Sequence, residues 1–98
     1  MKMHSTLQIA ADHPAFSGHF PDFPVFPGAA LLDEMLRIIE SARGIDLRGW
    51  HISSVKFLDA VRPRDSLLFE HEAPSAGLIR FTISVADRKI AGGTLHEP

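Results

Sequence analysis

Apolar side chains recur every three or four positions between residues 28 and 43, which is the spacing of one face of an α-helix. Gly44 follows this run directly, and glycine is the residue that most often ends a helix. The sequence therefore predicts one long amphipathic helix over residues 28–43. Its apolar face consists of a central line and a flank, namely Leu31, Met35, Ile38 and Ala42, widened by Leu32, Leu36 and Ile39.

Shorter segments on both sides of the helix have the composition and partial alternation of β-strands. We expect strands at residues 5–11, 50–58, 66–72, 78–86 and 89–95. Turn-forming residues separate the last four of these segments, at Pro63, at residues 74–77 and at residues 87–89. The order of one strand, one helix and a meander predicts an α+β fold, in which an antiparallel sheet covers the helix. Residues 1–98 are expected to form one domain.

The segment before the helix cannot be a strand, because it holds four prolines, at positions 14, 21, 24 and 27. Each proline removes a backbone donor and biases the preceding residue toward extended conformations. We predict a stiff loop between His13 and Gly28, which has little entropy to lose on folding.

Composition narrows the classes of function. Apolar residues make up 45% of the chain and charged residues 22%, and no apolar stretch approaches the roughly 20 residues that span a bilayer. The N-terminal residues show no secretory pattern, and the chain has no cysteine. The net charge is −2 with scattered basic residues, which argues against nucleic-acid binding. We expect a soluble, cytoplasmic protein, and its small size favours burial shared with a second copy.

Candidate chemistry begins with polar residues on the helix and in the proline-rich loop. Asp33 and Arg37 lie on the arc opposite the apolar line, where their spacing is also that of an ordinary surface ion pair. His19, between Gly18 and Phe20, can equally be a packed side chain bonded to a carbonyl group. A metal site at His13 and His19 is disfavoured because no second ligand cluster accompanies them. Periodicity alone leaves the ordinary structural interpretations open.

The stretch HPAFSGHFPDFPVFPGAALLDEML resembles the active-site segment of the β-hydroxyacyl-acyl-carrier-protein dehydratases of the FabZ and FabA type. The family pattern is G-H-F, then P-V-x-P-G, then an acidic residue inside the helix. Here the acidic position, fourteen residues after the histidine, is Asp33 and not Glu34. The later stretch VKFLDAVRPRDSLLFE is similar to the family's strand and turn. Matching positions in the first stretch are Gly18, His19, Phe20, Pro24, Val25, Pro27, Gly28 and Asp33.

This resemblance implies a hot-dog fold, with a sheet wrapped around one long central helix, and a dimer in which Asp33 faces His19 of the partner subunit. It also implies a lyase that removes water from a 3-hydroxyacyl thioester to give a trans-2-enoyl thioester. His19 would take the C2 proton as general base, and Asp33 would hold or protonate the departing hydroxyl. The backbone N–H of Gly28 would face the thioester oxygen, and Val25 would set the histidine tautomer through its carbonyl group.

The elimination needs only an acid, a base and an oxyanion donor, so no cofactor or metal is expected. The implied partner is an acyl carrier protein whose phosphopantetheine arm holds the substrate, with fatty acid or polyketide-like synthesis as the pathway. Lys56, Arg62, Arg64 and Arg88 are candidates for contacting it. Two alternatives are a hot-dog thioesterase and a non-catalytic carrier-binding subunit. Arg37 favours the latter, because the family commonly has Gln there and an arginine favours the charged form of Asp33.

Overall fold

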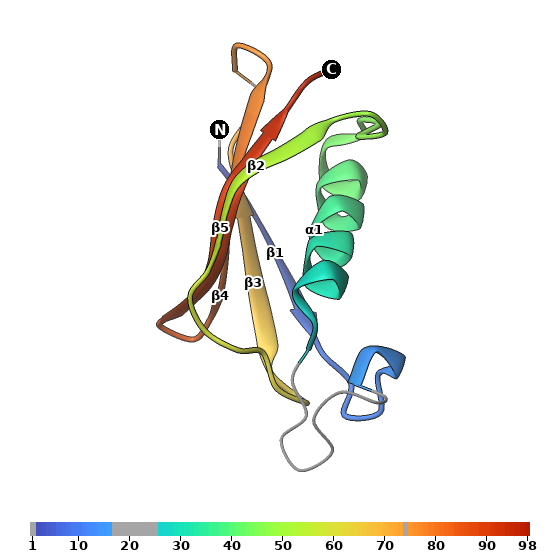
Figure 1. The fold of residues 1–98 in the computed structure, drawn as a ribbon, viewed down its shortest axis with the longest axis vertical. Helices are drawn as coiled ribbons and strands as arrows, with labels where there is room; N and C mark the ends of the chain where they lie inside the picture. Colours follow the sequence, from blue (N-terminus) through green and yellow to red (C-terminus); the bar gives the residue numbers. More distant parts are fainter. Residues whose placement is uncertain (1, 17–25, 74) are drawn as a thin grey trace.

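The fold is an antiparallel sheet curved around one helix. The computed structural model describes residues 2–16, 26–73 and 75–98. Its strands lie in the order β1-β3-β4-β5-β2, so β1 and β2 are the two edges, and α1 lies against one face (Figure 1). This arrangement confirms the predicted α+β class. The elements are β1 (Met3–Gln8), the short 3-10 helix η1 (Pro14–Phe16), α1 (Gly28–Arg43), β2 (His51–Phe57), β3 (Ser66–His71), β4 (Leu78–Val85) and β5 (Arg88–His96).

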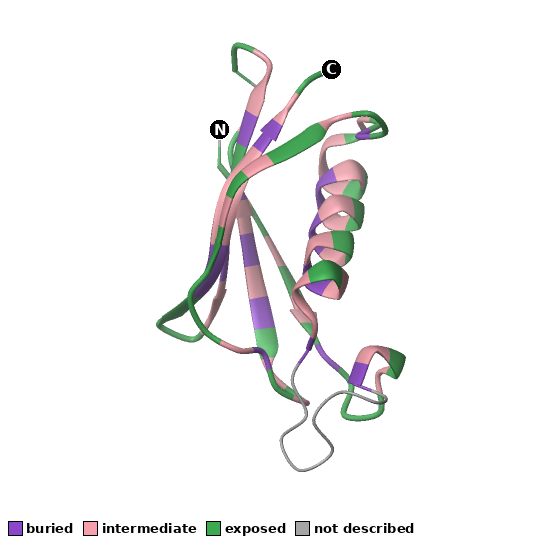
Figure 2. Cartoon of the chain, viewed as in Figure 1, coloured by how far each residue is buried: buried purple, intermediate pink, exposed green. Residues whose placement is uncertain are grey.

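Helix α1 has the bounds that the sequence predicts. Pro27 precedes it in an extended conformation, and Gly44 ends it with a φ of 64°, donating its N–H to the Glu40 carbonyl over 2.8 Å. The buried line is Leu31, Met35 and Ile39, each four residues from the last, whereas Ile38 and Ala42 are only half-buried (Figure 2). The sheet thus covers the helix along a line slightly rotated from the predicted one.

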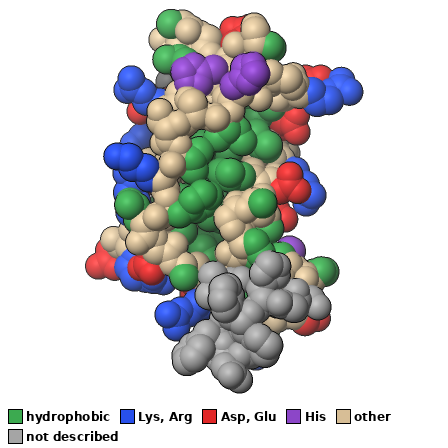
Figure 3. All heavy atoms as spheres, viewed as in Figure 1, with side chains coloured by type: hydrophobic (Ala, Val, Ile, Leu, Met, Phe, Trp, Pro, Cys, Tyr) green, Lys and Arg blue, Asp and Glu red, His purple; other side chains and the backbone are tan. Residues whose placement is uncertain are grey.

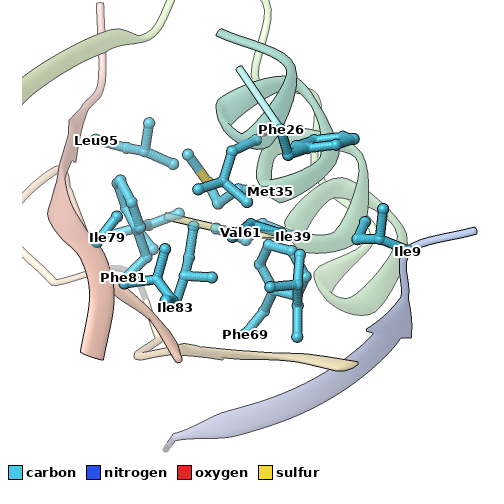
Figure 4. Packing of buried hydrophobic residues seen from close by; sticks show 14 of the residues in the cluster. Ile9, Phe26, Met35, Ile39, Val61, Phe69, Ile79, Phe81, Ile83 and Leu95 are labelled. Atoms are coloured by element: carbon cyan, nitrogen blue, oxygen red, sulfur yellow. The ribbon is translucent and has the colours of Figure 1, made fainter. Parts of the chain in front are cut away.

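The core lies between α1 and the sheet, where side chains from alternate positions of the strands point toward the helix (Figure 4). In β4 the inward residues are Ile79, Phe81 and Ile83, and each is at most 3% exposed. Phe69 of β3 and Leu95 of β5 complete this layer. Burying such side chains contributes roughly 1.5–3 kcal/mol each before chain entropy is subtracted.

The edge strand β2 has a β-bulge, a point where two of its residues lie opposite one residue of its neighbour β5. Ser53 pairs with Thr94 and Lys56 with Gly92, so Ser54 and Val55 together oppose Gly93. Ser54 has a φ of 55°, and this bulge turns Val55 toward the core and Lys56 toward the outer face of the sheet. The alternation of side chains between the two faces of β2 is therefore interrupted once, at Ser54, and the hydrophobic pattern of the sequence does not predict this interruption.

His71 is a buried polar residue at the end of β3, and only 1% of it is exposed. Its Nδ1 accepts a bond from Arg43 Nε at 2.9 Å, and Arg43 Nη2 donates to its carbonyl, also at 2.9 Å. Burial, and then the positive charge of Arg43, hold the pKa of His71 below its usual value, so the neutral ring is favoured. The pair ties the last turn of α1 to the sheet.

Candidate functional site

A largely apolar pocket of about 430 Å³ opens where α1 begins. Gly28 and Leu31 line it from the helix, while Phe57 and Val61 line it from the end of β2 and the loop that follows. The Phe26 N–H donates to the Val61 carbonyl over 2.8 Å, which fixes the start of the helix against that loop. The pocket is therefore formed by segments that are far apart in the sequence. Its remaining lining residues are Phe26, Leu58, Asp59, Ala60 and Ile90.

The first turn of α1 has no side-chain cap, because Pro27 occupies the capping position. The first N–H groups of a helix have no partner inside the helix, and they carry the positive end of its dipole. Gly28 also lies close to the Phe57 ring, since a Cβ built on it would be 2.9 Å from Phe57 Cζ. Glycine at this position lets the Phe57 ring pack directly against the first turn, whose unpartnered N–H groups are of the kind that can bind an anionic or carbonyl oxygen.

Asp33 lies outside this pocket, on the solvent side of α1, where its side chain is 68% exposed. Arg37 Nη2 is 3.6 Å from Asp33 Oδ2, and Arg37 Nη1 is 3.4 Å from Glu34 Oε1. The ion pair predicted from the spacing is present, but Glu34 shares the guanidinium. Asp33 borders a separate hollow of about 280 Å³ with Leu36, Arg37, Glu40, Leu47 and Arg48.

His13 has a role that its position in the sequence did not indicate. Its Nδ1 accepts the Ala15 N–H over 3.0 Å, and its Nε2 is 3.9 Å from Glu34 Oε1. Its ring centroid is 4.9 Å from that of Phe26 and 6.4 Å from that of Phe16, both in edge-on contacts. His13 therefore joins η1 to the side of α1 that carries Glu34. No periodicity links residues 21 positions apart, so sequence reasoning missed this contact.

Two of the four predicted site residues, His19 and Val25, lie outside the described residues. The other two, Gly28 and Asp33, are both on α1, but within one chain they border different hollows. In the described part of the chain, no group of three or more His, Asp or Glu side chains could hold a metal ion. No helix there is long and apolar enough to cross a membrane.

Comparison with known families decides the classification. A sequence model of the ApeI-like family, described as ApeI dehydratase, matches residues 1–94. The chain belongs to the ApeI-like dehydratase family. The predicted resemblance to acyl-carrier-protein dehydratases is thereby confirmed at the level of the family.

Curated relatives of this family member are 3-hydroxyacyl-[acyl-carrier-protein] dehydratases named FabZ. The protein from Lawsonia intracellularis is 35% identical over 74 residues, which cover 65% of this chain and 48% of the relative. The protein from Thermotoga petrophila is 33% identical over 67 residues, covering 63% of this chain and 48% of the relative. The matched region spans about half the length of these relatives.

Solved structures confirm the hot-dog fold. The dehydratase heterocomplex ApeI:P from Xenorhabdus doucetiae is similar with a TM-score of 0.80 and 24% identity, over 97% of this chain and 85% of that one. A 1,4-dihydroxy-2-naphthoyl-CoA thioesterase from Synechocystis has a TM-score of 0.66 and 16% identity, over 98% of this chain and 80% of that one. At these identities the likeness extends to the fold alone.

Proposed function

We propose that this chain is a hydro-lyase that removes water from a 3-hydroxyacyl thioester held on an acyl carrier protein, giving the trans-2-enoyl thioester. The observation that carries the proposal is the apolar pocket at the uncapped start of α1, in a chain of a dehydratase family. An acyl chain suits the apolar walls, and the thioester oxygen suits the backbone donors at Gly28.

In this proposal His19 takes the proton from C2, and Asp33 holds the C3 hydroxyl and protonates it as it leaves. The Gly28 N–H, with the helix dipole behind it, stabilises the negative charge that develops on the thioester oxygen. The Val25 carbonyl fixes the tautomer of His19. The elimination is balanced by one proton taken from C2 and one given to the departing hydroxyl, so it needs no cofactor.

A dimer of hot-dog domains is part of the proposal. Hydrophobic side chains gather on the face between β2 and α1 (Figure 3), and the exposed apolar residues of the β2 region are Ile52, Phe57 and Leu58. Among the described strands, β2 pairs on one side only, with β5, and an edge of this kind can pair with a strand of a second chain. In such a dimer the exposed Asp33 would meet His19 of the partner. Sedimentation of the purified chain tests this, and a monomer at catalytic concentrations would contradict it.

Mass spectrometry of a 3-hydroxyacyl carrier protein incubated with the chain tests the reaction. Loss of one water supports the proposal if His19→Ala and Asp33→Asn both abolish it. His4→Ala and Asp46→Asn are the matched controls, because His4 and Asp46 are exposed residues outside both hollows. Release of a free acid would instead indicate a thioesterase.

A non-catalytic carrier-binding subunit is the second candidate, and the ion pair between Arg37 and Asp33 favours it. This function predicts tight binding of the acylated carrier with no change in its mass. The ApeI:P structure is described as a heterocomplex, so the assay is repeated with a FabZ-type dehydratase added. Dehydration that appears only when both proteins are present would indicate that the chain acts as one subunit of a complex of two different dehydratase-family chains.

A further inference from the structure

A groove of about 290 Å³ crosses the outer face of the sheet, on the side away from α1. It runs over β2, β5 and β4, and its floor is the backbone at Gly92. Lys56 and Thr94 flank this floor on β2 and β5, and Thr82 lies beside it on β4. The groove does not belong to the pocket at the start of α1. Its other lining residues are Ser54, Leu58, Arg80, Phe81, Lys89 and Gly93.

Two local features create the groove. The bulge at Ser54 turns Lys56 to the outer face, opposite Gly92. Gly92 has no side chain, and a Cβ placed there would lie 3.5 Å from Lys89 Cε and 3.8 Å from Lys89 Nζ. The Lys89 ammonium group therefore lies over the glycine, and Lys56 pairs with the same glycine from β2, so lysines of two strands border one floor.

The groove concentrates positive charge in a chain whose net charge is −2. Within the described ranges, Lys56, Arg80 and Lys89 form no ion pair within 4.0 Å, whereas Lys2 on the same outer face has Glu70 at 3.7 Å. Two acidic residues lie on the neighbouring strand β3, since Glu70 pairs with Thr82 and the Glu72 N–H donates to the Arg80 carbonyl over 3.1 Å. Glu70 is itself paired, with Lys2 at 3.7 Å and with His4 at 3.8 Å, so Lys56 and Lys89 are the cations at the floor of the groove that have no such carboxylate partner among the described residues.

We infer that this groove binds a phosphate ester, with Lys56 and Lys89 as the charged donors and the hydroxyls of Thr82 and Thr94 as supporting donors. Ammonium groups that converge on a concave floor beside hydroxyls suit a compact tetrahedral anion. Leu58 lines both this groove and the pocket at α1. If the proposed function holds, on which this assignment rests, the phosphate is that of the pantetheine arm that carries the acyl chain.

Binding is tested on the unmodified chain with two probes that differ only in the phosphate, 4′-phosphopantetheine and pantetheine, by NMR titration of the backbone amides. We expect shifts at Gly92, Thr82 and Thr94 with the phosphorylated probe only. Lys56→Gln and Lys89→Gln each weaken that binding about threefold to fivefold, and the double variant about tenfold. Gly92→Val fills the floor at unchanged charge and also weakens binding. Lys2→Gln, an exposed lysine of the same face, leaves it unchanged.

Equal binding of the two probes would overturn the inference, as would an equal loss of affinity in Lys2→Gln, which would show only general attraction. Titration with coenzyme A and with a holo carrier protein then separates a free coenzyme from a carrier-bound arm. Dehydration of an N-acetylcysteamine thioester, which has no phosphate, separates this inference from the proposed function. Groove variants retain that activity if both hold. If the chain binds the phosphate but turns over no thioester, the proposed enzymatic function is refuted, while the inference that the groove binds phosphate stands.

Discussion

The same substitution, glycine to alanine, is expected to have unequal effects at two adjacent positions of β5. Gly93 faces the core, and a Cβ added to it would be 2.9 Å from Phe81 Cζ and 3.0 Å from Val55 Cγ2. Phe81 is only 3% exposed and cannot move into solvent. Gly92 faces outward, and the nearest atom to an added Cβ is the Phe81 carbonyl oxygen at 3.4 Å. Neither glycine has a positive φ, so only the space differs.

Gly93→Ala is expected to lower the free energy of unfolding by about 2 kcal/mol, within the range of about 1–3 kcal/mol for overpacked cores. For a domain of this size that corresponds to a melting temperature about 10 °C lower. Gly92→Ala is expected to lie within about 1 kcal/mol of the parent, because lost chain entropy in the unfolded state offsets the mild contact. Urea unfolding followed by circular dichroism measures both.

The steric explanation also predicts rescue. Phe81→Leu removes the ring atom nearest to the added methyl group, so Gly93→Ala should cost less in that background than alone. Equal stability of the Gly92→Ala and Gly93→Ala variants would refute the reasoning, because the faces of β5 would then not differ in packing. The same conclusion would follow from strictly additive effects of Gly93→Ala and Phe81→Leu.

Three further predictions concern charge and chain geometry. Because the pKa of His71 is lowered from 6.5 by burial and then by Arg43, the unfolded chain takes the proton first. The stability gained from the neutral ring is complete above about pH 6.5 and falls below it, by at most about 1.4 kcal/mol per pH unit. His71→Gln should flatten this fall in urea titrations at pH 7 and 5.5, whereas the exposed His51→Gln should not. Gly44→Ala should cost about 1 kcal/mol in thermal unfolding, because φ there is 64° and the space around the added methyl is empty. An unchanged melting temperature would contradict a left-handed helix end. Arg37→Gln removes the cation 3.6 Å from Asp33 and should raise the dehydration rate severalfold, while Lys2→Gln, at an exposed residue outside both hollows, leaves it unchanged. A slower Arg37→Gln enzyme would give the arginine a positive role.

Local signals account for the parts of the fold that the sequence predicted well. The bounds of α1 follow from Pro27 and Gly44, which act on the backbone wherever the helix lies. Four of the strands agree with their predicted ranges to within one residue at each end, because glycine, proline and aspartate separate them. The first strand covers residues 3–8 and not 5–11, since nothing in that stretch distinguishes the strand from the segment that follows it.

Features that depend on pairing were not visible in the sequence. In the second half of α1 the buried residue is Ile39, which was predicted on the flank of the apolar face, and not Ile38. The direction from which the sheet packs against the helix decides between these two neighbours. The contact of His13 with Glu34 and that of His71 with Arg43 each join residues that are distant in sequence. Of the site, the motif located Gly28 at the pocket, whereas the placement of Asp33 outside it depends on how the helix lies.

Ser54 is the extra residue of the bulge in β2. If Ser54 is left out, successive side chains of the strand alternate between the two faces of the sheet. Ser53 and Lys56 then face outward, and Val55 and Phe57 face the helix side. A chain that lacks this position could therefore keep every other side chain on its present face. It would also present a flatter edge, and flat edges attract unintended strand partners. We therefore expect relatives to differ in length by one residue at this position. The strand can gain or lose a residue here while the side chains on both sides of it stay on the same faces of the sheet.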